Sequence, residues 1–160
     1  GKGVQLLAGG DYNFTHCTLA SFGDAFITHK DPTLVINNST TTGGAPLQAQ
    51  FQNCIIWGDS SGLVPNEVVL NRAGSAAFNV RFDAVLWRVK DTPQPATITG
   101  AINNQLPGFD SINISKRFYD LKLSATSPAI NKGVTTTVNI DADGKPRPVA
   151  QPDLGAYERQ

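Results

Sequence analysis

The sequence carries little charge, and that charge is balanced. Of its 160 residues 16% are charged, and 13 Lys and Arg face 13 Asp and Glu, so the formal net charge is zero. An average domain carries roughly 25% charged residues, so charge repulsion does not favour disorder here. The balance, together with the lack of a Lys/Arg run, removes the electrostatic footprint of a nucleic-acid-binding protein. We therefore expect no nucleic-acid partner.

Cysteines and long apolar runs are also scarce. The two cysteines, Cys17 and Cys54, are too few for a Cys-rich zinc site or a disulfide framework. No apolar run approaches the roughly 18 residues of a membrane span, so we expect no membrane insertion. The apolar fraction of 40% is enough for a packed core, and the length suits one domain.

Helical periodicity is missing as well. Thr, Val, Ile, Asn, Gly and Pro dominate, and no long stretch repeats apolar residues with the spacing of a helix face. Short apolar stretches bounded by Gly, Pro, Asn or Asp instead indicate strands, at residues 4–7, 12–15, 33–37, 48–51, 66–71 and 79–82. This pattern predicts an all-β protein.

The sequence contains an internal repeat. Residues 14–19, 51–56 and 82–87 align without gaps as Phe, two residues, Cys or Val, one residue and a large apolar residue. A second alignment, of the strand that precedes this motif in each unit, matches Val4 with Thr33 and Val68. Each unit therefore reads as a strand, a loop, a second strand, a bend and a third strand.

The bend is expected between the Phe and the Cys or Val. These two positions are an odd number of residues apart, so one unbroken strand cannot turn both toward the core. A corner at His16, Asn53 and Ala84 solves this, and Asn suits the left-handed backbone of a corner better than His, and His better than Ala. Strands separated by corners and repeated in register predict a parallel β-helix.

The repeat segments and the C-terminal segments 123–133, 140–148 and 152–158 resemble the C-terminal part of right-handed parallel β-helix proteins of the kind carried on the surface of Bacteroidetes. The resemblance implies a right-handed, single-stranded parallel β-helix, here of about three coils with a C-terminal cap. It also implies a location outside a bacterium or on its outer-membrane surface. The sequence departs from the family at Ala84 and Val85, where Asn and Cys are more common. The family includes lyases, hydrolases and adhesins, so it implies no single reaction.

The expected organisation is one structural domain in two parts. Coils occupy residues 1–95, and the last strand segment and the capping region occupy residues 96–160. A strand at Val4–Leu7 with no preceding cap leaves an open apolar edge, which predicts self-association through the N-terminal coil.

Trp57 and Arg88 are the candidate ligand-binding residues. They occupy equivalent positions one residue beyond the inward Ile56 and Trp87, so both side chains are expected to point outward. An exposed Trp offers a flat face to a sugar ring, and Arg pairs with a carboxylate on it. The alternative is a cation–π pair that only covers the surface. The expected partner is a polysaccharide or a host glycan.

Five charged residues are candidates for catalysis: Lys30, Asp31, Arg88, Lys90 and Asp91. A Lys or Arg base with a cation serves β-elimination of an acidic polysaccharide, and two carboxylates serve glycoside hydrolysis. Charged loop residues are more often simply solvated. We therefore expect a non-enzymatic extracellular or surface module with a structural and glycan-binding role. The alternative is the C-terminal end of a polysaccharide lyase or glycoside hydrolase.

Two further features each leave an alternative open. Asp141 and Asp143 begin like a Ca²⁺ loop but lack a third acidic position and a downstream bidentate Glu, so a hairpin turn is favoured over a metal site. We otherwise expect no cofactor. Cys17 and Cys54 are expected to stack about 4.8 Å apart on successive coils, and buried free thiols are favoured over a disulfide.

Overall fold

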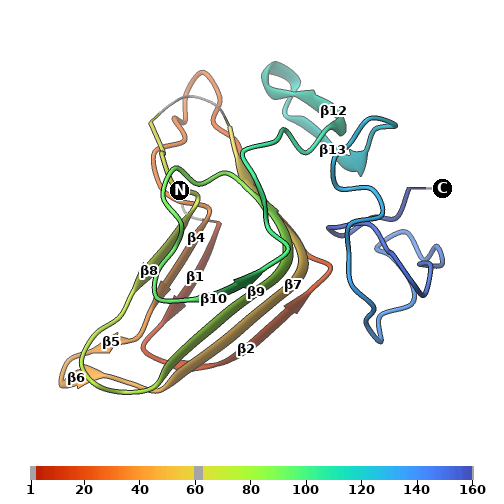
Figure 1. Cartoon of the computed structure of the whole chain (residues 1–160). Helices are drawn as coiled ribbons and strands as arrows, with labels where there is room; N and C mark the ends of the chain where they lie inside the picture. Colours follow the sequence, from red (N-terminus) through yellow and green to blue (C-terminus); the bar gives the residue numbers. More distant parts are fainter. Residues whose placement is uncertain (1–2, 60–62, 160) are drawn as a thin grey trace.

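The computed structural model describes residues 3–59 and 63–159, and its strands form parallel and antiparallel sheets (Figure 1). A three-stranded parallel sheet contains β1 (Val4–Leu7), β4 (Leu34–Asn37) and β8 (Val68–Asn71). A six-stranded parallel sheet contains β2 (Gly10–Thr15), β3 (Thr18–Ser21), β7 (Leu47–Gly58), β9 (Phe78–Trp87), β10 (Thr97–Thr99) and β11 (Ile102–Asn103). Two short antiparallel pairs consist of β5 (Ser39–Thr40) with β6 (Gly43–Gly44), and of β12 (Phe109–Asn113) with β13 (Phe118–Leu123). A 3₁₀ turn, η1 (Ile114–Lys116), joins the last two strands.

The repeat units pair with one another in register in the six-stranded sheet. Phe14, Phe51 and Phe82 are neighbours on β2, β7 and β9. The ring of Phe51 stacks on both others, with centroids 4.6 Å from Phe14 and 5.1 Å from Phe82. The alignment of residues 14–19, 51–56 and 82–87 is therefore confirmed.

The alignment of the first strand of each unit is wrong by one residue in the second unit. Val4 pairs with Leu34, not with Thr33, and Leu34 pairs with Val68. Leu34 and Ile36 are fully buried. A one-residue shift exchanges the two faces of a strand, so the register that buries these two side chains is the one that forms.

The two parallel sheets enclose a common apolar core. Leu34, Ile36 and Val68 from the three-stranded sheet belong to the same cluster as Phe51 and Phe82 from the six-stranded sheet. Burial of each such side chain stabilises the fold by roughly 1.5–3 kcal/mol. The core is thus the main link between the sheets.

The predicted corner is confirmed in all three units. His16, Asn53 and Ala84 have positive φ values of 54°, 55° and 52°. Beyond the corner Cys54 and Val85 enter the core, as expected. Thr99 of β10 pairs with Asp83, so Gly100, with φ 64°, takes the same position next to Ala84.

The prediction of a right-handed, single-stranded parallel β-helix is wrong. The strands lie in separate flat sheets, the larger of six strands, and they do not close into a solenoid. One physical reason is that β7 and β9 run through the corner as continuous strands, so the segments before and after it share one sheet. The all-β composition of the prediction does hold, because the described secondary structure is mostly strand.

The C-terminal segment, residues 124–159, does not act as the expected end cap. Figure 1 shows it beside the six-stranded sheet. Its Leu154 packs with Ile55 and Leu86, which point outward beyond the corner. The Gly155 N–H donates to the Asn53 carbonyl oxygen at 2.8 Å, and the Ala156 N–H donates to Thr18 Oγ1 at 3.0 Å. The segment therefore crosses successive strands on the outer side of the sheet.

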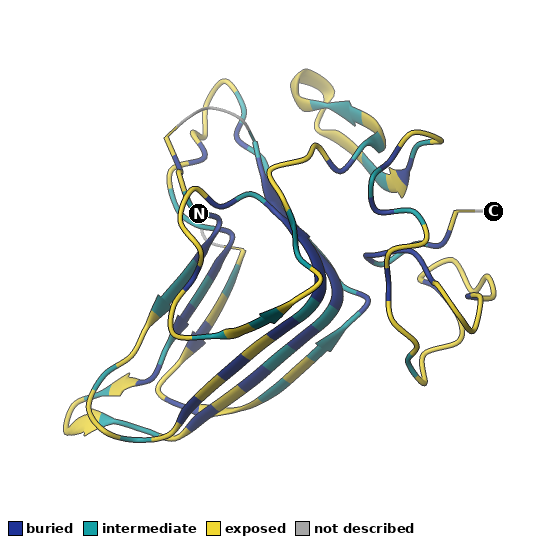
Figure 2. Ribbon diagram, viewed as in Figure 1, coloured by how far each residue is buried: buried dark blue, intermediate teal, exposed yellow. Residues whose placement is uncertain are grey.

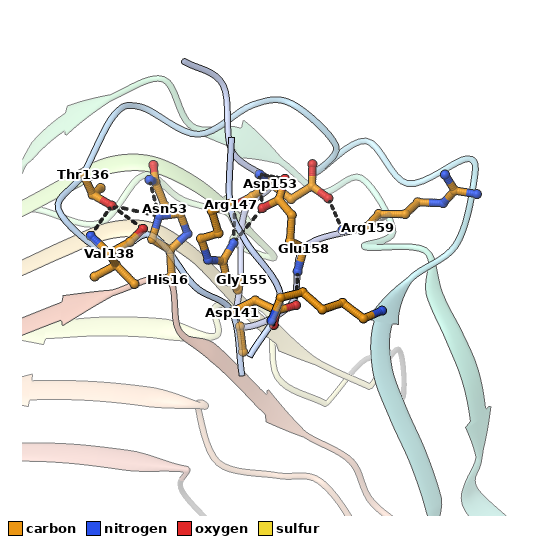
Figure 3. Close-up of polar contacts among 12 residues, drawn as sticks. His16, Asn53, Thr136, Val138, Asp141, Arg147, Asp153, Gly155, Glu158 and Arg159 are labelled. Carbon is orange, nitrogen blue, oxygen red and sulfur yellow. Dashed lines mark hydrogen bonds and ion pairs between the residues drawn. The ribbon is translucent and has the colours of Figure 1, made fainter. Parts of the chain in front are cut away.

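A buried polar network fastens this segment (Figure 3). Arg147 forms an ion pair with Glu158 at 2.9 Å, and both side chains are almost fully buried. The other terminal nitrogen of Arg147 donates to the Gly155 carbonyl oxygen at 2.9 Å. At the corner, His16 Nε2 lies 3.0 Å from Asn53 Nδ2 and 3.2 Å from Thr136 Oγ1. Loss of one partner from such a buried pair leaves an uncompensated charge and is therefore strongly destabilising.

Candidate functional site

The outer surface of the six-stranded sheet before the corner is an array of exposed and half-buried polar side chains, here called the polar face. Alternation along each strand turns one residue in two outward, and Figure 2 shows the resulting stripes on β2, β7 and β9. The inward positions of β7 hold Leu47, Ala49 and Phe51. The outward positions of the three strands are Asp11, Asn13, Thr15, Gln48, Gln50, Gln52, Asn79, Arg81 and Asp83.

Strand pairing arranges the polar face in rows. Asn13, Gln50, Arg81 and Thr97 are direct neighbours on four successive strands. Asp11, Gln48 and Asn79 form the row beside them. Neighbouring strands lie about 4.8 Å apart, so each row repeats a hydrogen-bonding side chain at that interval.

The polar face is hollowed where β10 begins. A cavity of about 500 Å³ lies between β7, β9 and the segment before β10, and its polar lining includes Gln48, Gln50, Asn79, Arg81, Gln94 and Thr97. Arg81 Nη2 lies 3.3 Å from Asp83 Oδ2, and the Arg81 side chain remains 52% exposed. Its guanidinium is thus oriented at the surface without being removed from solvent.

This chemistry suits a ligand rich in hydroxyl groups. Gln and Asn side chains each offer a donor and an acceptor, Arg offers donors only, and Asp acceptors only. A sugar hydroxyl both donates and accepts, so it is served by such a mixed surface. The polar face lacks the apolar centre typical of a protein–protein interface and the positive charge of a nucleic-acid site.

Trp57 is not the exposed platform that the sequence predicts. It points outward, but its side chain packs with Ile55, Leu86 and Leu154 and is 5% exposed. The outward orientation was therefore correct and the exposure wrong, because Trp57 lies in an apolar cluster that Leu123, Ala129 and Leu154 complete. The edge of Trp57 lines an apolar cavity of about 350 Å³ together with Phe22, Phe109 and Asp59.

Arg88 is engaged inside the protein and does not stand beside Trp57 as a free cation. Its Nη2 lies 2.5 Å from Glu67 Oε1 and donates to the Asp59 carbonyl oxygen at 2.6 Å. Only 16% of its side chain is exposed. The expected pairing of Arg88 with a ligand carboxylate is therefore wrong in this structure, because Glu67 already supplies the carboxylate.

Glu67 is the centre of this buried cluster, and sequence reasoning missed it. It is fully buried and lies 2.9 Å from His29 Nε2. Its second oxygen accepts from the Thr33 N–H at 3.0 Å and from Thr33 Oγ1 at 2.8 Å. Gly58 has no side chain here because a Cβ would overlap Glu67 and His29. The ion pairs and hydrogen bonds of the cluster hold residues 29–33, 59 and 88 together, although the buried Nε of Arg88 has no hydrogen-bond partner.

The other catalytic candidates do not meet at one point. Lys30 and Lys90 are exposed, and Asp31 is half-buried. Asp91 exchanges hydrogen bonds with Asn66, whose Nδ2 donates to Asp91 Oδ2 at 3.3 Å. Within residues 3–59 and 63–159, no ion pair joins two of Lys30, Asp31, Arg88, Lys90 and Asp91. The structure therefore offers no assembled acid–base pair from this set in the described ranges.

Asp141 organises a tight turn. It accepts from the N–H groups of Asp143 at 2.9 Å, Lys145 at 2.8 Å and Glu158 at 2.9 Å. Burial acts to raise the pKa of Asp141, but these N–H groups outweigh it and lower that pKa below its usual value. Asp143 pairs with Lys122 at 3.0 Å. Across the described part of the chain, no three His, Cys, Asp or Glu side chains are placed to hold a metal ion.

Comparison with known family models, with curated proteins and with solved structures finds no match for this chain. No helix in the described ranges has both the length and the apolar character needed to cross a membrane. The polar face is the feature of the described residues that bears on function. Sequence reasoning missed its residues, although the alternation of Gln48, Gln50 and Gln52 with apolar residues was the signal that could have found them.

Proposed function

We propose that the protein is a non-enzymatic module that binds a polysaccharide or host glycan through the polar face. The observation that carries the proposal is the row of Asn13, Gln50, Arg81 and Thr97, which crosses four strands beside a cavity of about 500 Å³. Repeated donors and acceptors at a regular interval suit a repeating chain of hydroxyl-bearing rings. The guanidinium of Arg81 pairs with Asp83 at 3.3 Å but stays 52% exposed, which favours a glycan that also carries carboxylates.

The place of action that we propose is the outside or the outer-membrane surface of a bacterium. Its support is the resemblance of the repeat and C-terminal segments to surface proteins of Bacteroidetes. A low charge content and an exposed array of amides are compatible with that setting. The proposal predicts that the protein binds glycans presented on a surface.

We also propose self-association through the N-terminal edge. β1 and β2 are edge strands of the two parallel sheets. The first aromatic ring of the stack, Phe14, belongs to this edge and is partly exposed. Edge strands with apolar neighbours favour pairing with another copy. Sedimentation over a range of concentrations is expected to show a reversible increase in mass, and a strict monomer at high concentration contradicts this.

Glycan binding is tested on arrays of neutral and uronate-containing polysaccharides, followed by calorimetric titration. The Gln50→Ala/Arg81→Ala double variant is expected to lose at least tenfold in affinity. Gln5→Ala, an exposed Gln on β1 of the other parallel sheet, is the matched control and should bind like the wild type. Unchanged affinity of the double variant would overturn the proposed site.

The same polysaccharides are assayed for turnover. We expect no unsaturated uronate product and no new reducing ends. Product whose formation is lost in Lys30→Ala or Lys90→Ala would replace the binding function with the alternative, a polysaccharide lyase or glycoside hydrolase. Because binding and turnover are measured on the same samples, the two functions are separated by one set of experiments.

A further inference from the structure

Cys17 and Cys54 lie next to each other immediately beyond the corner. Each directly follows the corner residue of its unit, His16 or Asn53, and the Ile55 N–H donates to the Cys17 carbonyl oxygen at 2.9 Å. Both are free thiols. Cys54 is fully buried, whereas Cys17, between β2 and β3 at the edge of the sheet, is partly exposed. The two thiols thus differ in solvent exposure, although they occupy equivalent positions in their repeat units.

Each sulfur contacts backbone carbonyl oxygens next to the corner. Cys54 Sγ donates to the Gln52 carbonyl oxygen at 3.3 Å and approaches the carbonyl oxygen of Phe14, in the neighbouring unit, at 3.4 Å. Cys17 Sγ donates to the Thr15 carbonyl oxygen at 3.5 Å. A hydrogen bond from Cys54 lowers the pKa of Cys17 to about 7, and the same contact and burial raise the pKa of Cys54. The direction of these shifts favours the thiolate form at Cys17 and the thiol form at Cys54.

The backbone spacing permits a bond between the two sulfurs. Neighbouring strands lie about 4.8 Å apart, within the roughly 4.4–6.8 Å that disulfides span between Cα atoms. The third unit has Val85 at the equivalent position, so the thiols form an isolated pair. An exposed thiolate beside a buried thiol is the arrangement of an attacking and a resolving cysteine.

We propose that Cys17 and Cys54 form a reactive dithiol, which a small-molecule disulfide such as oxidised glutathione converts into an intramolecular disulfide. The Cys17 thiolate attacks one sulfur of the oxidant, whose S–S bond breaks and releases one glutathione thiolate. Cys17 gives its proton to the medium, and the released glutathione thiolate takes one up from the medium.

Cys54 completes the reaction. Its thiol loses a proton to the medium and attacks the Cys17 sulfur of the mixed disulfide. The Cys17–Cys54 bond forms, and the second glutathione leaves as a thiolate that is protonated. Two electrons pass from the two cysteines to the oxidant. The product ties the outermost strand, β3, to β7, so oxidation is expected to raise the denaturant midpoint of unfolding.

The test treats the folded protein with oxidised glutathione and follows it by thiol titration after unfolding and by intact mass. The wild type is expected to lose both titratable thiols and two hydrogens of mass, with no glutathione retained. Cys54→Val, which copies the third unit, is expected to stop with one glutathione on Cys17. Cys17→Val is expected to react at least tenfold more slowly than the wild type.

Three results overturn the proposal: two thiols still titratable after prolonged treatment, glutathione retained on the wild type, or Cys17→Val reacting at the wild-type rate. If one valine variant does not fold, the wild-type mass and thiol count still decide the outcome. The experiment is independent of glycan binding.

Discussion

The two halves of β7 have opposite outer surfaces although they belong to one strand. Before the corner at Asn53 the outward residues include Gln48 and Gln50, which are accessible to solvent. Beyond the corner the outward residues include Ile55 and Trp57, which are buried in a cluster with Leu123, Ala129 and Leu154 from later in the chain. The inner surface is apolar in both halves. The outward residues alone therefore distinguish a surface that is free for a ligand from one that the chain covers itself.

An outward position on this sheet is not the same as an exposed one. Trp57 and Gln50 both point away from the core between the parallel sheets. Covering Ile55 and Trp57 removes apolar area from water at roughly 25 cal/mol per Å², and covering Gln48 and Gln50 would bring no such gain. The C-terminal segment therefore packs on one half and leaves the other uncovered.

The largest loss of stability is expected from removing a buried side chain in the covered half of β7. Trp57→Ala removes a buried aromatic side chain that packs with Leu154 and Leu86, and should destabilise the protein by about 3–5 kcal/mol. Gln48→Ala changes an exposed residue on the same strand and should stay within about 0.5 kcal/mol of the wild type. Urea unfolding followed by circular dichroism measures both values.

Equal midpoints for these two variants would contradict the assignment of covered and uncovered halves. If Trp57→Ala is too unstable to purify, Trp57→Phe serves instead. It retains an aromatic ring, so a smaller loss in the same direction is expected.

Much of this arrangement follows from the sequence, and the exceptions have physical causes. Three aligned Phe residues and an odd spacing to Cys54 predict both the pairing and the corner, because local geometry decides them. The burial of Trp57 depends on later parts of the chain, such as Leu123 and Leu154, and Glu67 meets His29 and Arg88 only through long-range packing. No local pattern marks such contacts. The prediction of a closed solenoid was wrong for the same reason, because closure depends on long-range packing between the sheets.

A substitution at the corner that separates the two halves is expected to change stability less. Ala84 has φ 52°, a conformation that costs a residue with a side chain roughly 1–2 kcal/mol. Ala84→Gly relieves this cost, which offsets the entropy and packing that the change loses. Ala49→Gly, at a buried position inside β7, loses the same entropy and packing but relieves no backbone strain. We expect Ala84→Gly to be more stable than Ala49→Gly by about 1 kcal/mol in urea unfolding. The reverse order would contradict a strained corner.

The smallest effect concerns pH at the same corner. Burial and the nearby charge of Arg147 lower the pKa of His16 from 6.5 to about 4. The unfolded chain takes up this proton first, so His16 makes stability fall as pH drops from about 6.5 toward 4. Glu158, whose pKa burial raises, acts in the opposite direction near its own pKa.

The His16→Asn variant isolates the histidine, because Asn53 already fits the corresponding corner. Its melting temperature should fall less than that of the wild type between pH 6.5 and pH 4.5. Parallel curves for the two proteins would contradict a neutral, buried His16.

The claim that the uncovered half binds a glycan is tested most directly by calorimetric titration of one array-identified polysaccharide into three proteins of equal stability. The wild type and Gln5→Ala are expected to bind with the same affinity, and Gln50→Ala/Arg81→Ala at least tenfold more weakly. Equal affinity for all three, or a loss confined to Gln5→Ala, would contradict the account.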